Sequence, residues 1–163
     1  MLDHISITVS DFAAAERFYD AIMKALDVAK VGRSDRWLGY GERADAEHPD
    51  RVYIAIYRGA KPDEATGRHW CFKAKSRSEV DAFWRAGIAA GGTDDGPPGL
   101  RHYHAAYYGA FLRDPDGNKV EAVCHRAEWW QGAKLSPSLR AERSNPYRGI
   151  TDRWIASSLR SSQ

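Results

Sequence analysis

Two histidines and one glutamate are the residues whose types and placement point to metal chemistry. They are His4, His69 and Glu121. Imidazole is the commonest protein ligand for transition metals, and two imidazoles with one carboxylate suit a divalent metal that keeps open coordination positions. Open positions let a metal polarise a substrate oxygen or activate a bound water. We therefore predict that these side chains bind one divalent metal ion. Zn, Ni, Mn and Fe all tolerate this ligand set.

The two histidines open two copies of one segment, 65 positions apart. Aligned without a gap, the copies share these pairs: His4 with His69, Phe18 with Phe83, Tyr19 with Trp84, and Ala21 with Ala86. An internal repeat indicates two copies of one supersecondary unit. The repeat therefore places two imidazoles at equivalent points of one fold.

Each copy begins with a predicted strand that leads into a helix. Residues 4–9 alternate between polar and apolar types, which predicts a strand with one buried face. His4 and Thr8 fall on the opposite, polar face of that strand. Apolar residues follow at helical spacing over residues 12–26, so the helix is expected to cover the apolar face. Three further strands complete the first copy, and the second copy is expected to repeat the plan.

The glutamate lies near the centre of the last predicted strand, residues 119–124, behind a turn motif at residues 114–118. Its neighbours in the strand are apolar, and an unpaired buried charge is costly, so Glu121 requires a partner. The sequence predicts an α+β fold with module one at residues 1–60 and module two at residues 67–125.

Two local patterns in module two affect the remaining site predictions. Gly96-Pro97-Pro98-Gly99 predicts a loop that interrupts any strand around it. Residues 103–113 are aromatic and predict one long strand, with His104 and Tyr108 on one side and Tyr107 on the other. We predict His104 as an acid or base near the metal and Tyr107 as a packing residue.

Charge and composition limit the function classes. The formal net charge is +2, but the segment from Lys134 onward carries six basic and two acidic residues, which leaves residues 1–133 at −2. This distribution does not favour nucleic-acid binding by the body of the protein. We expect residues 126–163 to form a basic C-terminal extension. An N-terminus without a signal sequence and the absence of a long apolar run predict a cytoplasmic protein that does not interact with membranes.

Two motifs resemble those of the vicinal oxygen chelate superfamily: His4-x4-Val9-x-Asp11-x6-Phe18-Tyr19, and Phe111-x2-Asp114-Pro115-Asp116-Gly117-Asn118-x-Val120-Glu121. That superfamily includes glyoxalase I, extradiol dioxygenases, fosfomycin-resistance thiol transferases and bleomycin-resistance proteins. The resemblance covers residues 1 to about 125. It implies two tandem βαβββ modules that form a curled, cup-shaped mixed sheet with the helices outside. It also implies a homodimer and a metal in the cup that a small substrate chelates through vicinal oxygens.

Carried over by position, the family's metal ligands fall on His4, His69 and Glu121, and Glu121 is also the predicted catalytic carboxylate. The fourth ligand position of glyoxalase I is expected near Ile56 or Tyr57, neither of which is a carboxylate. This departure favours the three-ligand set of the dioxygenase and thiol-transferase branches. The resemblance leaves several reactions open: a lyase, isomerase or dioxygenase, a thiol transferase of the fosfomycin-resistance type, or metal-free sequestration of a ligand.

Three further residues are predicted to contact the small-molecule substrate. They are Thr8, Tyr108 and Arg113. Thr8 shares the polar face of the first strand with His4. Arg113 has the charge to bind an anionic group.

Overall fold

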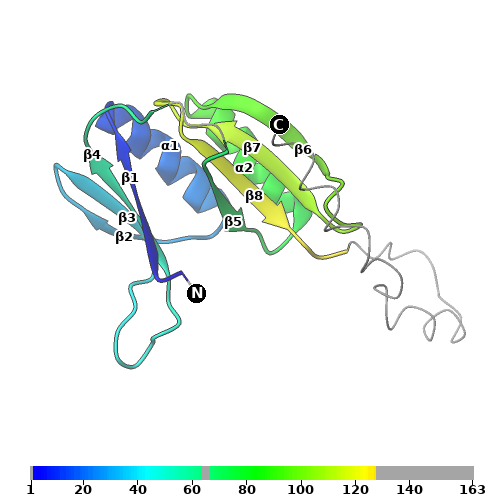
Figure 1. The fold of residues 1–163 in the computed structure, drawn as a ribbon, viewed down its shortest axis with the longest axis horizontal. Coiled ribbons are helices and arrows are strands. Elements are labelled where there is room, and N and C mark those ends of the chain that lie inside the picture. The colour runs from blue at the N-terminus through cyan, green and yellow to red at the C-terminus, as the bar shows by residue number, and fades with distance from the viewer. Residues whose placement is uncertain (1, 64–66, 128–163) are drawn as a thin grey trace, which may run out of the picture. The chain divides into compact units, whose positions relative to one another are not determined.

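The computed structural model describes residues 2–63 and 67–127, which form two helices and two four-stranded sheets (Figure 1). The chain divides into two compact units, Met1–Glu128 and Trp129–Gln163. The second unit, and with it most of the predicted basic extension, lies outside the described residues. Neither of the described helices is long and apolar enough to cross a membrane.

The two modules repeat one order of elements. Module one contains β1 (His4–Val9), α1 (Phe12–Ala25), β2 (Lys30–Arg33), β3 (Trp37–Gly41) and β4 (Tyr53–Arg58). Module two contains β5 (His69–Lys73), α2 (Arg77–Ala89), β6 (Thr93–Leu100), β7 (Tyr108–Arg113) and β8 (Lys119–Cys124). The sheets run β1-β4-β3-β2 and β5-β8-β7-β6, and in each the first strand lies parallel to the last. The predicted α+β fold of two tandem βαβββ modules is confirmed.

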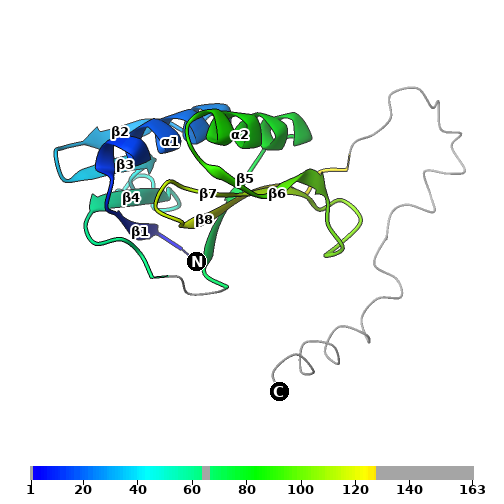
Figure 2. The same ribbon diagram turned by 90° about the horizontal axis from the view of Figure 1, so that it is seen from above.

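The core lies between the helices and one face of each sheet. Figure 2 shows both helices on the same side of the strands, where α1 packs against α2. The repeated aromatics Phe18 and Phe83 are fully buried, and burying a side chain of this size stabilises the fold by roughly 2 kcal/mol. In β1, Ile7 and Val9 point into this core, so the other face of the sheet, which carries His4, is left open.

Two strand predictions in module two are wrong. β6 contains the Gly96–Gly99 segment and pairs with β7 through two register shifts, one on each side of Gly96. β6 is an edge strand, and an edge strand tolerates proline because the side without a neighbouring strand needs no backbone N–H donor. Gly96 has the positive φ of 145° that the break in register requires. The predicted long strand begins only at Tyr108, so the segment 101–107 does not follow strand alternation.

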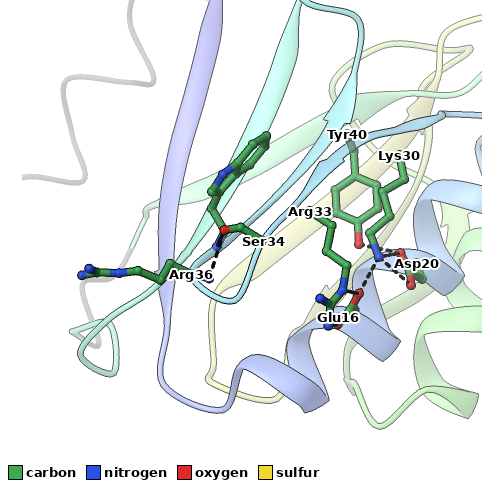
Figure 3. A network of polar contacts seen from close by, with 8 residues as sticks. Glu16, Asp20, Lys30, Arg33, Ser34, Arg36 and Tyr40 are labelled. Carbon is green, nitrogen blue, oxygen red and sulfur yellow. Dashed lines mark hydrogen bonds and ion pairs between the residues drawn. The ribbon is translucent and has the colours of Figure 1, made fainter.

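A charged network ties the β2–β3 hairpin to α1 (Figure 3). Glu16 accepts hydrogen bonds from Lys30 Nζ at 2.7 Å and from Arg33 Nε at 2.8 Å. Asp20, one turn further along α1, accepts from Lys30 and from the Tyr40 hydroxyl at 2.7 Å. The hydrogen bonds from Arg33 and then Lys30 lower the pKa of Glu16 to about 2. The network therefore stays charged over the ordinary pH range.

The predicted turn at residues 114–118 is confirmed, and it also joins the two modules. Asp116 accepts from the backbone N–H of Ser10 at 2.7 Å and from the Ser10 hydroxyl, at the junction between β1 and α1. Asp114 accepts from the hydroxyl of the buried Tyr19 at 2.9 Å. Asn118 donates to the carbonyl of Thr8. Carboxylates of one module thus satisfy polar groups of the other.

Candidate functional site

A histidine and a buried carboxylate meet on the open face of the second sheet. β5 and β8 lie parallel with Cys71 opposite Glu121. His69 lies two residues before Cys71 and therefore on the same face of the sheet. The Nε2 atom of His69 lies 3.1 Å from Oε2 of Glu121. The Glu121 side chain is 2% exposed and that of His69 is 39% exposed. The pair therefore consists of a buried carboxylate, that of Glu121, behind an imidazole that solvent can reach, that of His69.

The second oxygen of Glu121 is occupied by a tyrosine that the sequence analysis assigned to packing. The Tyr107 hydroxyl donates to Oε1 of Glu121 at 2.6 Å. Burial, followed by the hydrogen bond to Glu121, raises the pKa of Tyr107 above its ordinary value, so the hydroxyl keeps the proton that it donates. The expectation for Tyr107 was wrong because residues 101–107 are not a strand.

Cys71 borders the same carboxylate on the open face of β5. Local desolvation and then the charge of Glu121 raise the pKa of the Cys71 thiol to about 12. With this raised pKa the thiol is neutral near pH 7. Because the thiolate is the reactive form, Cys71 is not an activated nucleophile.

His4 lies at the start of β1 on the open face of the first sheet. Its Nδ1 atom lies 2.6 Å from Oδ1 of Asp3, and its ring stacks on Tyr53 at 5.1 Å with an interplanar angle of 17°. Metal-binding histidines commonly hold a carboxylate with the ring nitrogen that does not face the metal, and the Asp3 contact has that form. The ring is thus oriented with Nε2 available.

The structure brings together two of the three predicted metal ligands. Within residues 2–63 and 67–127, no group of three or more His, Cys, Asp or Glu side chains is placed to hold a metal ion. His69 and Glu121 do fit such a site, because donors bonded to one metal at about 2.1 Å lie about 3.0–3.4 Å apart in tetrahedral or octahedral geometry. His4 is not part of that pair in the single chain, and the triad stays a prediction.

The equivalent of Glu121 in module one is Ala55. Ser6 pairs with Ala55 across β1 and β4, just as Cys71 pairs with Glu121 across β5 and β8. The fourth ligand position, expected near Ile56 or Tyr57, therefore falls one residue earlier, at Ala55. Ile56 is fully buried on the helix side, and Tyr57 lies two residues beyond Ala55 on the open face. The inference that module one lacks this carboxylate holds with Ala55 in its place.

The remaining predicted site residues lie apart from the pair. His104 contacts His125, with Nε2 and Nδ1 at 2.9 Å, and packs edge-on against Tyr107. Tyr108 lies on the helix side of β7, where its hydroxyl donates to Asp81 of α2 at 2.8 Å and links sheet to helix. Its predicted contact with a substrate stays a prediction. The shared side predicted for His104 and Tyr108 is wrong, because His104 precedes the strand.

Arg113 and Thr8 have different surroundings. Arg113 contacts Asp95 at 3.3 Å and donates to the carbonyl of Gly117, which is the behaviour of a strand-end side chain. Thr8 lines a cavity of about 370 Å³ between the two modules, together with Arg68 and Trp70. A larger cavity of about 630 Å³ is lined mainly by residues of the β3–β4 loop and includes none of the predicted site residues.

Comparisons with known proteins agree with this architecture. The family model described as "Glyoxalase/Bleomycin resistance protein/Dioxygenase superfamily" matches residues 1–122. None of the curated proteins matches the chain. A glyoxalase/bleomycin resistance protein from Albidiferax ferrireducens T118 is 33% identical with a TM-score of 0.63, and the match covers 78% of this chain and 99% of that one.

Two fosfomycin resistance proteins share the fold at lower identity. FosX from Mesorhizobium loti is 18% identical with a TM-score of 0.55, and the match covers 86% of this chain and 97% of that one. FosX from Listeria monocytogenes, whose structure was solved with Mn(II) and 1S,2S-dihydroxypropylphosphonic acid, is 21% identical with a TM-score of 0.55, covering 76% and 88%. From the match over residues 1–122, the chain belongs to the glyoxalase/bleomycin resistance protein/dioxygenase superfamily.

Proposed function

We propose that the protein is a metal-dependent enzyme that binds a small substrate through vicinal oxygens, as a lyase, isomerase or dioxygenase. The observation that carries this proposal is the contact between His69 Nε2 and Glu121 Oε2 at 3.1 Å. Glu121 is buried, and the Tyr107 hydroxyl occupies its Oε1 atom, which leaves Oε2 directed at the solvent-accessible imidazole of His69. A buried carboxylate at this position is costly, and a bound cation would offset that cost.

The residues that would hold the metal are His69, Glu121 and a His4 side chain. A bound metal would act as a Lewis acid toward the substrate oxygens. Glu121 contributes negative charge from a buried position, and Tyr107 fixes one of its oxygens. His69 would present Nε2 to the metal, and ligation would require that nitrogen to be unprotonated.

We further propose that a second copy of the chain supplies the His4 ligand. Module two presents two donors in contact, whereas the described residues of one chain hold no group of three or more His, Cys, Asp or Glu side chains placed for a metal ion. His4 lies on an open sheet face with its ring already oriented by Asp3 and Tyr53. A two-fold dimer would place this face against the second sheet of the other copy and form two equal sites.

A thiol transferase of the fosfomycin-resistance type is the second candidate. What supports it is the fold shared with the FosX protein solved with Mn(II), which holds a divalent metal on this fold. The same donor set would serve either reaction, because both need a metal with open positions. Substrate assays separate them: a methylglyoxal–glutathione adduct and catechols for the first candidate, and fosfomycin with a thiol for the second.

Metal analysis of the purified protein and of reconstituted apoprotein tests the proposal. We expect about one divalent metal per chain, and we expect His4→Ala and Glu121→Ala each to remove it. His48→Ala is the matched control, because His48 is also exposed and also holds an aspartate through Nδ1. Absence of metal from both native and reconstituted wild-type protein rules out the two metal-dependent candidates and leaves a metal-free binding protein.

Mixing the two metal-free variants tests the contribution of a second copy. If His4 acts across the dimer, a heterodimer of His4→Ala and Glu121→Ala contains one intact site, and random exchange restores about a quarter of the sites. If the three ligands come from one chain, mixing restores none.

A further inference from the structure

The segment between β6 and β7, residues 101–107, carries a side chain that acts on the proposed site from outside the sheet. Its last residue, Tyr107, donates its hydroxyl hydrogen to Oε1 of Glu121 at 2.6 Å. We propose that Tyr107 is a positioning residue: it reserves Oε1 and leaves Oε2, the oxygen beside His69, as the donor to the metal. This inference rests on the proposed function.

A carboxylate ligand has two equivalent oxygens and can bind a metal through either or both. In Glu121 the two oxygens are not equivalent, because Oε1 accepts from a hydroxyl and Oε2 lies 3.1 Å from the His69 Nε2 atom. A hydrogen bond to a charged acceptor is roughly twice as strong as one between neutral groups. The Tyr107 hydroxyl therefore holds the plane of the carboxylate before any metal arrives.

The segment that carries Tyr107 is itself held in place. The Ala106 N–H donates to Nδ1 of His104 at 3.2 Å, so the proton of this imidazole lies on Nε2 and is donated to Nδ1 of His125 at 2.9 Å. Backbone bonds from Arg101 N–H to the Tyr107 carbonyl and from Tyr107 N–H to the His104 carbonyl close the segment. The Tyr107 ring also packs against His125 at 5.1 Å. This arrangement gives the exposed His104 a role in supporting Tyr107.

The strand below the tyrosine leaves space for this contact. Gly109 faces Glu121 and Tyr107, and a Cβ atom at this position would lie 3.2 Å from Oε1 of Glu121 and 3.3 Å from Cε1 of Tyr107. Both distances are shorter than ordinary van der Waals contact. A side chain at position 109 would therefore require the Tyr107 ring or the Glu121 carboxylate to shift.

The test is a titration of apoprotein with Mn(II), in which electron paramagnetic resonance measures the free ion. Partners of ligating groups typically change metal affinity by about 10–100-fold when they are mutated, and we expect that loss for Tyr107→Phe. Tyr108→Phe is the matched control, because it removes a hydroxyl from the neighbouring residue, which bonds Asp81 on the other side of the sheet. We expect Tyr108→Phe to leave the Mn(II) affinity within about twofold of wild type.

Three further measurements separate positioning from general damage. In metal-loaded minus apo infrared difference spectra, the splitting of the carboxylate stretches should narrow in Tyr107→Phe, as two-oxygen binding becomes possible. His104→Ala keeps the hydroxyl but loosens the segment, so its loss of affinity should lie between those of wild type and Tyr107→Phe. Thermal unfolding of each apoprotein checks that the variants are folded.

The outcomes distinguish this inference from the proposed function. If wild-type protein binds no Mn(II), Zn(II), Ni(II) or Fe(II), the proposed function fails. If wild type binds metal and a folded Tyr107→Phe binds it equally well with an unchanged infrared splitting, Tyr107 has no positioning role and the proposed function stands. An equal loss in Tyr108→Phe also overturns the inference, because the effect then does not depend on contact with Glu121.

Discussion

The two modules share a fold but differ in what they carry on the open face of the sheet. Module two has Glu121 opposite Cys71, with Tyr107 bonded to the carboxylate. Module one has Ala55 at the equivalent position, and the Trp37 ring lies so close to Gly39 that a Cβ there would meet it at 2.5 Å. One module thus holds a carboxylate beside the imidazole of His69, and the other holds the imidazole of His4 stacked on the Tyr53 ring. The proposed three-ligand site would draw on both modules.

The connections between the last two strands differ in the same way. In module one, residues 42–52 join β3 to β4 as a long, largely exposed loop. In module two, residues 114–118 form a tight turn with three buried polar side chains that bond to module one. Module two therefore stabilises its neighbour, and the two modules should unfold together.

The largest expected effect is on that junction. Asp114→Ala removes the acceptor of the buried Tyr19 hydroxyl and of two hydrogen bonds from Asn118. Unpartnered buried groups cost about 1–3 kcal/mol each, so we expect a loss of about 3 kcal/mol in the free energy of unfolding, measured by urea denaturation. Asp45→Ala, in the exposed loop of module one, is the matched control and should barely move the urea midpoint. Wild type and Asp114→Ala should each still unfold in a single transition that both modules share. Two separate transitions in wild type would contradict coupled modules.

The second prediction restores the missing carboxylate. Ala55→Glu places a carboxylate in module one at the register of Glu121, at a position that is 2% exposed. In the apoprotein we expect a loss of about 2 kcal/mol in the free energy of unfolding, because the buried charge has no partner. Added Mn(II) should then raise the melting temperature more than it does in wild type, since His4 gains a second donor beside it. Ala55→Gln should show a similar loss without the larger metal effect, and an equal response in both variants would contradict the equivalence of the two positions.

The repeat and the periodicities predicted the two modules and both helices. They failed where the backbone left regular alternation. The side of Tyr107 was assigned by strand parity, but residues 101–107 follow turns and local hydrogen bonds instead. Proline in Gly96–Gly99 was taken as a break, whereas an edge strand accommodates it. Ala55 was missed because a constant offset of 65 residues gives Ile56, and the register shows that module two is one residue longer before its last strand.

The third prediction compares the support of His4 with the support of Glu121. Asp3→Asn weakens the carboxylate contact to Nδ1 of His4, but both side chains are at least half exposed. We expect about a threefold loss of Mn(II) affinity, smaller than for the buried Tyr107 contact, because solvent and salt screen the exposed pair. The titration should be made at low and high salt, and the difference from wild type should shrink as salt rises. A loss as large as that of Tyr107→Phe would show that the two supports are equally important.

The smallest expected effect concerns the link between helix and strand in module one. Glu16→Gln removes the charge that Lys30 and Arg33 contact, and we expect a loss of about 0.5 kcal/mol in the free energy of unfolding near pH 7. The folded-state pKa of Glu16 is lowered from 4.5 to about 2, so this stabilisation is present above pH 4.5 and is lost as the pH falls through 2. Urea denaturation of wild type and variant from pH 7 to pH 2 should therefore converge.

Module two links its sheet to its helix through a tyrosine hydroxyl, as Tyr40 does with Asp20 in module one, and this neutral donor supplies the control for the ion pairs of Glu16. The Tyr108 hydroxyl donates to Asp81 of α2 at 2.8 Å, so the contact does not depend on a pair of opposite charges. Tyr108→Phe should therefore destabilise the fold to the same extent at low and high salt, whereas the effect of Glu16→Gln should fall in 1 M salt, where the screening length is about 3 Å. If both variants respond to salt alike, the two modules do not differ in how their helices are attached, and the asymmetry between them is confined to the open faces and the turn.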